Sequence, residues 1–132
     1  MFLFQLNLPE KMAFIYLAKK MVTVDDGIVD DYERHLLDIM SNEMQISVND
    51  HSIVFDLEKL ASEFQSEFSR KICLVELLSL ALVNEDYNQK QKDLLLGLCN
   101  FFDISKNNFS ELESWVLKMM NLYKEGIELI KS

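Results

Sequence analysis

The densest cluster of ionisable side chains lies at residues 25–33, in the stretch Asp-Asp-Gly-Ile-Val-Asp-Asp-Tyr-Glu. Five carboxylates within nine residues repel one another unless a cation, a basic side chain or helix N-terminal amides offset their charge. Hard oxygen ligands of this kind favour calcium, magnesium or manganese over zinc. The cluster therefore predicts a candidate site for a divalent cation, with four carboxylates as its ligands: Asp25, Asp26, Asp30 and Glu33.

This stretch does not have the ligand spacing of an EF-hand. Gly27 and Glu33 match positions six and twelve of a calcium loop, but that frame puts valines at positions one and three, where calcium needs oxygen ligands. An interpretation without a metal is also open. Asp30 and Glu33 have the spacing of a helix capping box. Asp25 and Asp26 can be the solvated flank of a glycine turn.

The elements that must position these carboxylates are predicted to be helices. Three glycines and one proline are too few for the many turns of a sandwich or barrel. Apolar residues recur at helical spacing, which predicts a single all-α domain over residues 1–132, a compact bundle of about six helices. The predicted helices span about residues 9–21, 31–44, 55–68, 71–83, 89–102 and 110–131, of which 71–83 is apolar almost all round and is expected to be central.

Two short features refine these helices. A second capping box, Ser110 with Glu113, is expected to open the C-terminal helix. Strand signal is confined to the first six residues and to residues 46–48. Residues 2–6 are expected either to pack back over the bundle or to dock on another chain.

An internal repeat shapes the predicted fold. A shift of 59 positions lays residues 11–40 over residues 70–99 without a gap, with apolar residues matched along both helices. The acidic positions align too, since Asp26 falls over Glu85. The chain is therefore expected to contain two helix–acidic loop–helix repeats, about residues 11–44 and 70–102, followed by the C-terminal helix.

The first repeat resembles the TerB-like (tellurite resistance) family. The resemblance is carried by the stretch from Ala18 to Leu37, in which Asp26-Gly27 is followed by Glu33 at the start of the next helix, and its echo runs from residue 79 to residue 96. It implies a compact all-helical fold of two such repeats and a metal ion bound by the acidic loop residues. It also implies a link to tellurite and other stress responses.

The second repeat departs from the family pattern. Glu85 stands at the Asp position, Asp86 at the Gly position, and Lys92 where the Glu should be. A charged ammonium group cannot ligate a cation, so a second equivalent metal site is not expected. Lys92 can instead pair with the carboxylates of the first loop if the two loops are neighbours in the fold.

Three further chemical groups have ordinary explanations. Glu76 is expected to mark, with Cys73, Ser79 and Val83, the one edge of the central helix that reaches solvent, and the alternative is an additional ligand that faces the acidic loops. Cys73 and Cys99 lack metal-site spacing and are expected to be buried, reduced thiols, as in a cytoplasmic protein. His35 is expected to be a surface or half-buried residue.

The composition excludes several classes of function. A net charge of −9 argues against binding to nucleic acid backbones or anionic membranes, since both select for an excess of Lys and Arg. No apolar run approaches the roughly 20 residues of a transmembrane helix, so the protein is not expected to be membrane-embedded. Catalysis is not expected either, because the sequence has no nucleophile paired with a base and no Gly-rich phosphate loop.

Two functional hypotheses follow. The first is a non-enzymatic, TerB-like cytoplasmic protein of a stress-response or defence system, with a divalent cation in its first acidic loop. The alternative is a metal-independent interaction module, of the adaptor or immunity type, whose acidic face binds a basic partner protein. Residues 1–66 carry 5 basic and 12 acidic side chains, so the acidity lies mainly in the half with the intact loop. Both hypotheses expect that distribution.

Overall fold

Six α-helices and one short 3-10 helix make up the part of the chain that the computed structural model describes, residues 1–24, 27, 29–46, 55–83 and 87–132. The expected all-helical class is confirmed, and residues 3–5 form a 3-10 helix in place of the strand signal at the start of the chain. In chain order the elements are η1 (Leu3–Gln5), α1 (Leu8–Thr23), α2 (Asp31–Met44), α3 (Leu57–Ser62), α4 (Glu67–Val83), α5 (Gln89–Phe102) and α6 (Lys106–Lys131).

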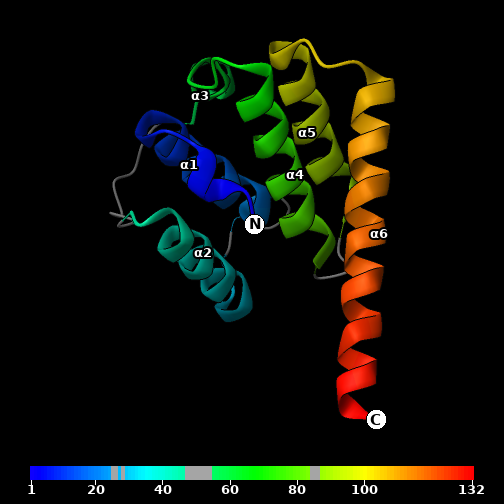
Figure 1. Cartoon of the computed structure of the whole chain (residues 1–132). Helices are drawn as coiled ribbons and strands as arrows, with labels where there is room; N and C mark the ends of the chain where they lie inside the picture. The colour runs from blue at the N-terminus through cyan, green and yellow to red at the C-terminus, as the bar shows by residue number, and fades with distance from the viewer. Residues whose placement is uncertain (25–26, 28, 47–54, 84–86) are drawn as a thin grey trace.

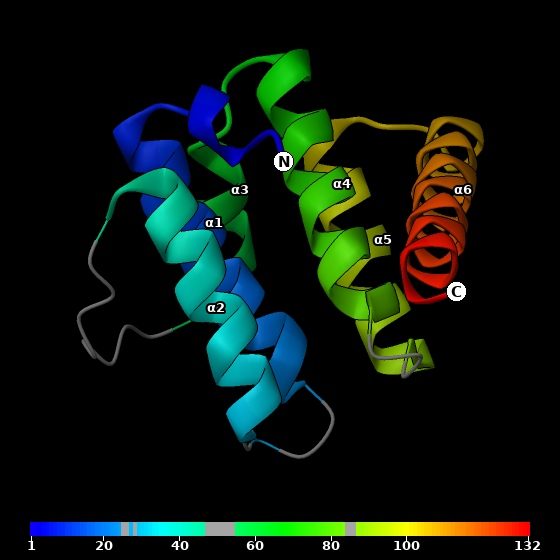
Figure 2. The ribbon, with the colours of Figure 1, turned by 60° about the horizontal axis from the view of Figure 1, so that its bottom comes forward.

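The central element is α4, as the sequence predicts. It contacts α1, α5, α6 and η1, and Figures 1 and 2 show it between α1 on one side and α5 and α6 on the other. Ten of its 17 residues are buried. A helix that is apolar on every side needs such a position, because each of its faces must be covered by another element.

The predicted helix over residues 55–68 is wrong at its C-terminal end. α3 stops at Ser62, and the backbone N–H groups of residues 63 and 64 close the turn on Leu60 and Ala61. Phe64 is then fully buried with its ring edge-on to Phe102, at a centroid distance of 5.6 Å. Phe64, just beyond the end of α3, therefore joins the core through a contact with α5.

Two helices begin four residues earlier than the sequence predicts. α4 starts at Glu67 because Ser66 and Ser69 cap it, each hydroxyl accepting from the other residue's N–H group. α6 starts at Lys106, where the Ser105 hydroxyl accepts from the Asn108 N–H group at 3.1 Å. The predicted capping box at residues 110–113 therefore lies inside α6. Any serine that precedes helical residues can cap a helix, so the sequence spacing alone does not distinguish Ser105 from Ser110 as the start of α6.

The hairpin of α1 and α2 and the hairpin of α4 and α5 bury the same positions. All eight buried residues of α1 coincide with buried residues of α4 at an offset of 59. The four buried residues of α2 coincide with buried residues of α5 at an offset of 58, not 59. These α2/α5 pairs are Glu33/Gln91, Leu37/Leu95, Ser41/Cys99 and Met44/Phe102.

The ends of α2 and α5 fix the offset of 58 independently. Each helix closes on a non-glycine residue in the left-handed region, Gln45 at φ 57° and Asp103 at φ 56°. The isoleucine that follows each of these residues donates its N–H group back across the last turn, Ile46 to Ser41 and Ile104 to Cys99. The gapless shift of 59 is therefore wrong for the second helix of the hairpins, by one residue.

Candidate functional site

The start of α2 brings two of the four predicted cation ligands together. The Asp30 carboxylate accepts from the Glu33 N–H group at 2.7 Å, and the Glu33 carboxylate accepts from the Asp30 N–H group at 3.2 Å. Both negative charges then lie at the positive end of the helix dipole. The expected capping box is confirmed, and Asp25 and Asp26 lie outside the described residues.

The start of α5 has the same geometry with amide side chains. The Asn88 side chain accepts from the Gln91 N–H group at 3.0 Å, and the Gln91 side chain accepts from the Asn88 N–H group at 3.3 Å. Gln91 is buried, and its Nε2 also donates to the Met21 carbonyl oxygen at 3.1 Å. This one side chain therefore caps α5 and ties it to the C-terminal part of α1.

The offset of 58 corrects the expected role of Lys92. The residue equivalent to Glu33 is Gln91, and Lys92 is equivalent to Arg34. The second hairpin thus has a neutral amide, and not an ammonium group, at the position of the predicted ligand. Glu85 and Asp86 lie outside the described residues.

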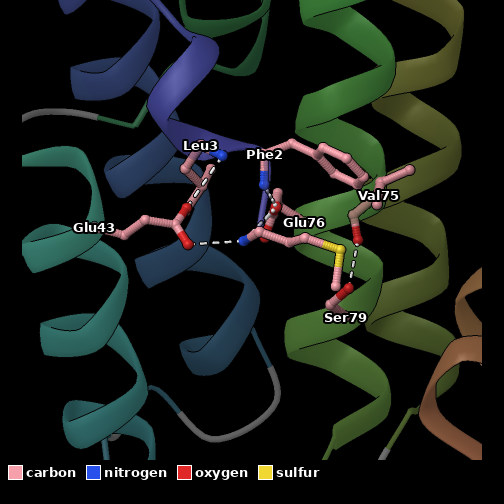
Figure 3. Close-up of polar contacts among 7 residues, drawn as sticks. Phe2, Leu3, Glu43, Val75, Glu76 and Ser79 are labelled. Atoms are coloured by element: carbon pink, nitrogen blue, oxygen red, sulfur yellow. Dashed lines mark hydrogen bonds and ion pairs between the residues drawn. The ribbon is translucent and has the colours of Figure 1, made fainter. Parts of the chain in front are cut away.

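A second polar cluster surrounds the amino group of Met1 (Figure 3). The ammonium nitrogen lies 2.8 Å from the Glu43 carboxylate and 3.1 Å from the Glu76 carboxylate. Glu76 also accepts from the Phe2 N–H group at 2.7 Å, and Glu43 accepts from the Leu3 N–H group at 3.1 Å. The start of the chain is thereby fastened to α2 and α4 together.

These carboxylates control the charge of the Met1 amino group. Partial burial by itself lowers the pKa of this amine, but the hydrogen bonds and charges of Glu43 and Glu76 outweigh it, so the pKa is raised above its ordinary value of 8.0. The amino group is therefore a stable cation at neutral pH, which both carboxylates need as their partner.

The expectation that Glu76 lies at a solvent edge is wrong. Glu76 is only 4% exposed and Cys73 is fully buried, while Ser79 is half-buried with its hydroxyl donating to the Val75 carbonyl at 2.9 Å. Residues 1–6 cover this edge, with Leu3 and Leu6 buried, so the expectation that this segment packs over the bundle is confirmed. Sequence patterns do not predict this ion pair, because Glu76 and Met1 lie far apart along the chain.

The two cysteines and the described histidine behave as expected. Cys73 and Cys99 are free and buried. Burial raises the pKa of the Cys73 thiol well above 9.0 and raises that of Cys99 to about 11, so both thiols stay protonated. His35 is exposed.

Several large apolar side chains of α6 are exposed. In the first half of this helix Phe109 and Val116 are buried. In the second half Leu122, Tyr123, Leu129 and Ile130 are 68%, 71%, 76% and 81% exposed. Figure 1 shows the reason, because the orange-to-red half of α6 runs past the ends of α4 and α5. Periodicity predicts the helix, but it does not reveal where the neighbouring helices stop.

Within the described ranges, no three His, Cys, Asp or Glu side chains converge as a metal site would require. No described helix has both the length and the apolar character of a membrane span. No family model, curated protein or solved structure matches this chain. Function must therefore be inferred from the capped hairpins, the Met1 cluster and the surface of α6.

Proposed function

We propose that this chain is a non-enzymatic protein–protein interaction module. The observation that carries the proposal is the second half of α6, where four large apolar side chains are more than two thirds exposed. Contiguous apolar surface of this kind marks sites of protein association, because its exposure to water is unfavourable. The helix-in-groove mode of recognition uses such an amphipathic helix.

The charge distribution supports two separate surfaces. Residues 106–132 hold four Lys and four Glu, so the whole net charge of −9 belongs to residues 1–105. An acidic body of that kind favours a basic partner and steers its approach at low salt. The two surfaces can then serve different partners, the neutral α6 through apolar contact and the acidic body through attraction of a basic protein.

Site-specific photo-crosslinking in the native cell tests this proposal. A photoreactive amino acid replaces Tyr123 on the apolar side of α6, and in a control it replaces Asn121 on the opposite side. We expect protein adducts from position 123 that are absent at position 121. An absence of adducts from position 123, in a chain that folds normally, would contradict the interaction module.

Cation binding at the first acidic segment is a second candidate function. It is favoured by one comparison, in which Asp30 and Glu33 carry charge where Asn88 and Gln91 achieve the same capping with neutral amides. Capping alone needs only an acceptor oxygen, so the first hairpin carries a charge here that its capping geometry does not require. Asp25 and Asp26 would complete the ligand set, with calcium, magnesium or manganese favoured over zinc.

Calorimetric titration of the metal-stripped protein tests the cation site. Saturable heat with calcium, magnesium or manganese that is lost in Asp26→Asn would support it. Heats equal to those of the variant would leave these carboxylates as helix caps and solvated charge. Asp38→Asn is a matched control, because it removes one exposed carboxylate from the outer side of α2.

Membership of a TerB-like group, with a cytoplasmic role in a stress-response or defence system, is likewise a proposal. Its support is the pair of hairpins with matched caps and matched buried positions. Growth of the native host without this gene, with and without tellurite, tests it. Equal sensitivity in both strains would argue against a tellurite role.

A further inference from the structure

The second half of α6 is amphipathic over its full circumference. At 100° per residue its apolar residues occupy about one half of the helix surface, and its polar residues occupy the other half. We call the apolar half the tail face, and it consists of Met119, Met120, Leu122, Tyr123, Gly126, Ile127, Leu129 and Ile130. The opposite half holds Lys118, Asn121, Lys124, Glu125, Glu128 and Lys131.

The tail face continues the buried line of the same helix. Phe109 and Val116 lie on the line that α6 turns toward the bundle, and Tyr123 and Ile130 follow Val116 at intervals of seven residues. One edge of the tail face, with Tyr123 and Ile130, therefore points to the side where α4 packs against the first half of the helix, but past the end of α4. Leu122 and Leu129 lie about 120–140° round the helix from Val116 and face away from the bundle. The described part of the chain leaves all four of these side chains more than two thirds exposed.

Gly126 gives an independent sign of close helix contact. Among the described residues, a Cβ atom at this position would meet nothing within 4 Å, and its backbone is helical, so neither their packing nor the local conformation requires glycine. Glycine in a helix interior costs about 1 kcal/mol relative to alanine. It does allow two helices to approach closely, since interaxial distance depends on the side chains at the contact.

We infer that the tail face binds the tail face of a second copy, as an antiparallel helix pair with two-fold symmetry. This inference rests on the proposed function, because it names the partner of that surface. In an isologous pair the same patch serves both subunits, so each tail would lie along the exposed tail face of the other copy. The two acidic bodies would lie at opposite ends of the pair, which limits their repulsion.

The charges on α6 favour a copy of itself over an acidic, basic or membrane partner. Residues 118–131 hold three Lys and two Glu, in the order Lys118, Lys124, Glu125, Glu128 and Lys131, so an antiparallel copy can place Lys near Glu. A basic partner would find no net negative charge on this segment. An anionic bilayer would attract the tail weakly and repel the body, which carries the net charge of −9.

The area of the tail face suits a weak dimer. Burying one Leu-sized side chain removes on the order of 100 Å² from water. Four exposed side chains on each copy, with the half-buried Met119, Met120 and Ile127 counted at half, give a total of roughly 1,100 Å², in the range of weak, transient interfaces. We therefore expect a dissociation constant in the micromolar range, about 1–100 µM.

Sedimentation velocity over about 1 µM to 1 mM tests the inference. The wild-type chain should shift from monomer to dimer with concentration. Ile130→Glu should weaken the dimer at least about 30-fold, which corresponds to about 2 kcal/mol. Asn121→Glu adds the same charge on the opposite side of the helix and should dimerise as the wild type does. Both positions are exposed, so both variants should fold, which circular dichroism checks.

Each other outcome overturns the inference. A wild-type chain that stays monomeric at about 1 mM excludes the second copy. Equal dimerisation of the wild type and Ile130→Glu would place the interface elsewhere, and equal loss in both variants would show sensitivity to charge and not to the tail face. The crosslinking experiment tests the proposed function separately. Adducts from position 123 to a different protein would support the interaction module, and they would name a partner other than a second copy.

Discussion

Gln91→Glu is the substitution that tests the capped hairpins most sharply. Gln91 has two roles that require opposite hydrogen-bond polarity, since one end of its amide accepts from the Asn88 N–H group and the other donates to the Met21 carbonyl. A carboxylate has the same shape and can accept in the same way, but it has no proton for Met21. The substitution therefore leaves the cap and removes only the buried link to α1.

The magnitude follows from burial. Gln91 is 7% exposed, so the unpaired Met21 carbonyl and the new carboxylate beside it are both poorly hydrated. An unsatisfied buried group costs about 1–3 kcal/mol, and the added charge raises the expected loss to about 3 kcal/mol at neutral pH. For a chain of 132 residues this lowers the melting temperature by roughly 10 °C.

The pH dependence has a definite sign. A protonated carboxyl can donate to the Met21 carbonyl, so folding favours the protonated form and raises the pKa of the substituted group above its ordinary value of about 4.3. The loss of stability should then be small near pH 4 and should grow as the pH rises through that raised pKa. Urea unfolding of the variant and the wild type, compared between about pH 4 and pH 8, measures the difference.

Glu33→Gln is the matched control at the equivalent position of the first hairpin. An amide oxygen can still accept from the Asp30 N–H group, so the expected loss is under about 1 kcal/mol, mainly from the helix dipole. The reasoning is refuted if Gln91→Glu costs less than the control, or if its cost is the same at both ends of the pH range. Either result would mean that the bond to Met21 does not hold the hairpins together.

Three further predictions concern other parts of the fold. The Met1 amine has a raised pKa in the folded protein, so its contribution to the free energy of unfolding should be complete below about pH 8 and be lost as the pH rises through the folded pKa. Glu76→Gln should make the free energy of unfolding, measured in urea, less dependent on pH. The Tyr87 hydroxyl donates to the Glu113 carboxylate at 2.9 Å, so Tyr87→Phe should lower the free energy of unfolding by about 1–2 kcal/mol, whereas an unchanged midpoint would deny this bond any role. Gly126→Ala should raise the helix content of the dilute monomer, seen by circular dichroism, yet weaken dimerisation in the ultracentrifuge, and stronger dimerisation would contradict the close contact.

The sequence predicts best those helices whose ends are set locally. α2 and α5 span the residues that the pattern predicts, because the side chains of Asp30 and Asn88 cap them by accepting from the N–H group three residues further along. α3 ends earlier than predicted, and just beyond its end Phe64 packs on Phe102, a partner 38 residues further on. No local pattern contains that contact.

The candidate site divides in the same way. The pairing of Asp30 with Glu33 is predictable because both partners lie in one helical turn. The burial of Glu76 is not, since its partners are the Met1 amine and the Phe2 N–H group, more than 70 residues away. The exposure of the second half of α6 is not predictable for a further reason. The apolar periodicity is the same in a helix that packs against a neighbour and in one that does not.

The matched hairpins also indicate where their roles differ. Their buried positions coincide, but three of the buried pairs differ in charge: Glu10/Ser69, Leu17/Glu76 and Glu33/Gln91. Glu10 and Ser69 both cap the start of their helix. Glu76 receives the start of the chain, whereas a carboxylate at the fully buried position of Leu17 would lack the Met1 amine as its partner. At Glu33/Gln91 the first hairpin keeps a carboxylate and the second binds α1. Exchanging only Glu33 and Gln91 would therefore separate the charge of the first hairpin from the bond to α1 in the second, because either side chain can still cap its helix.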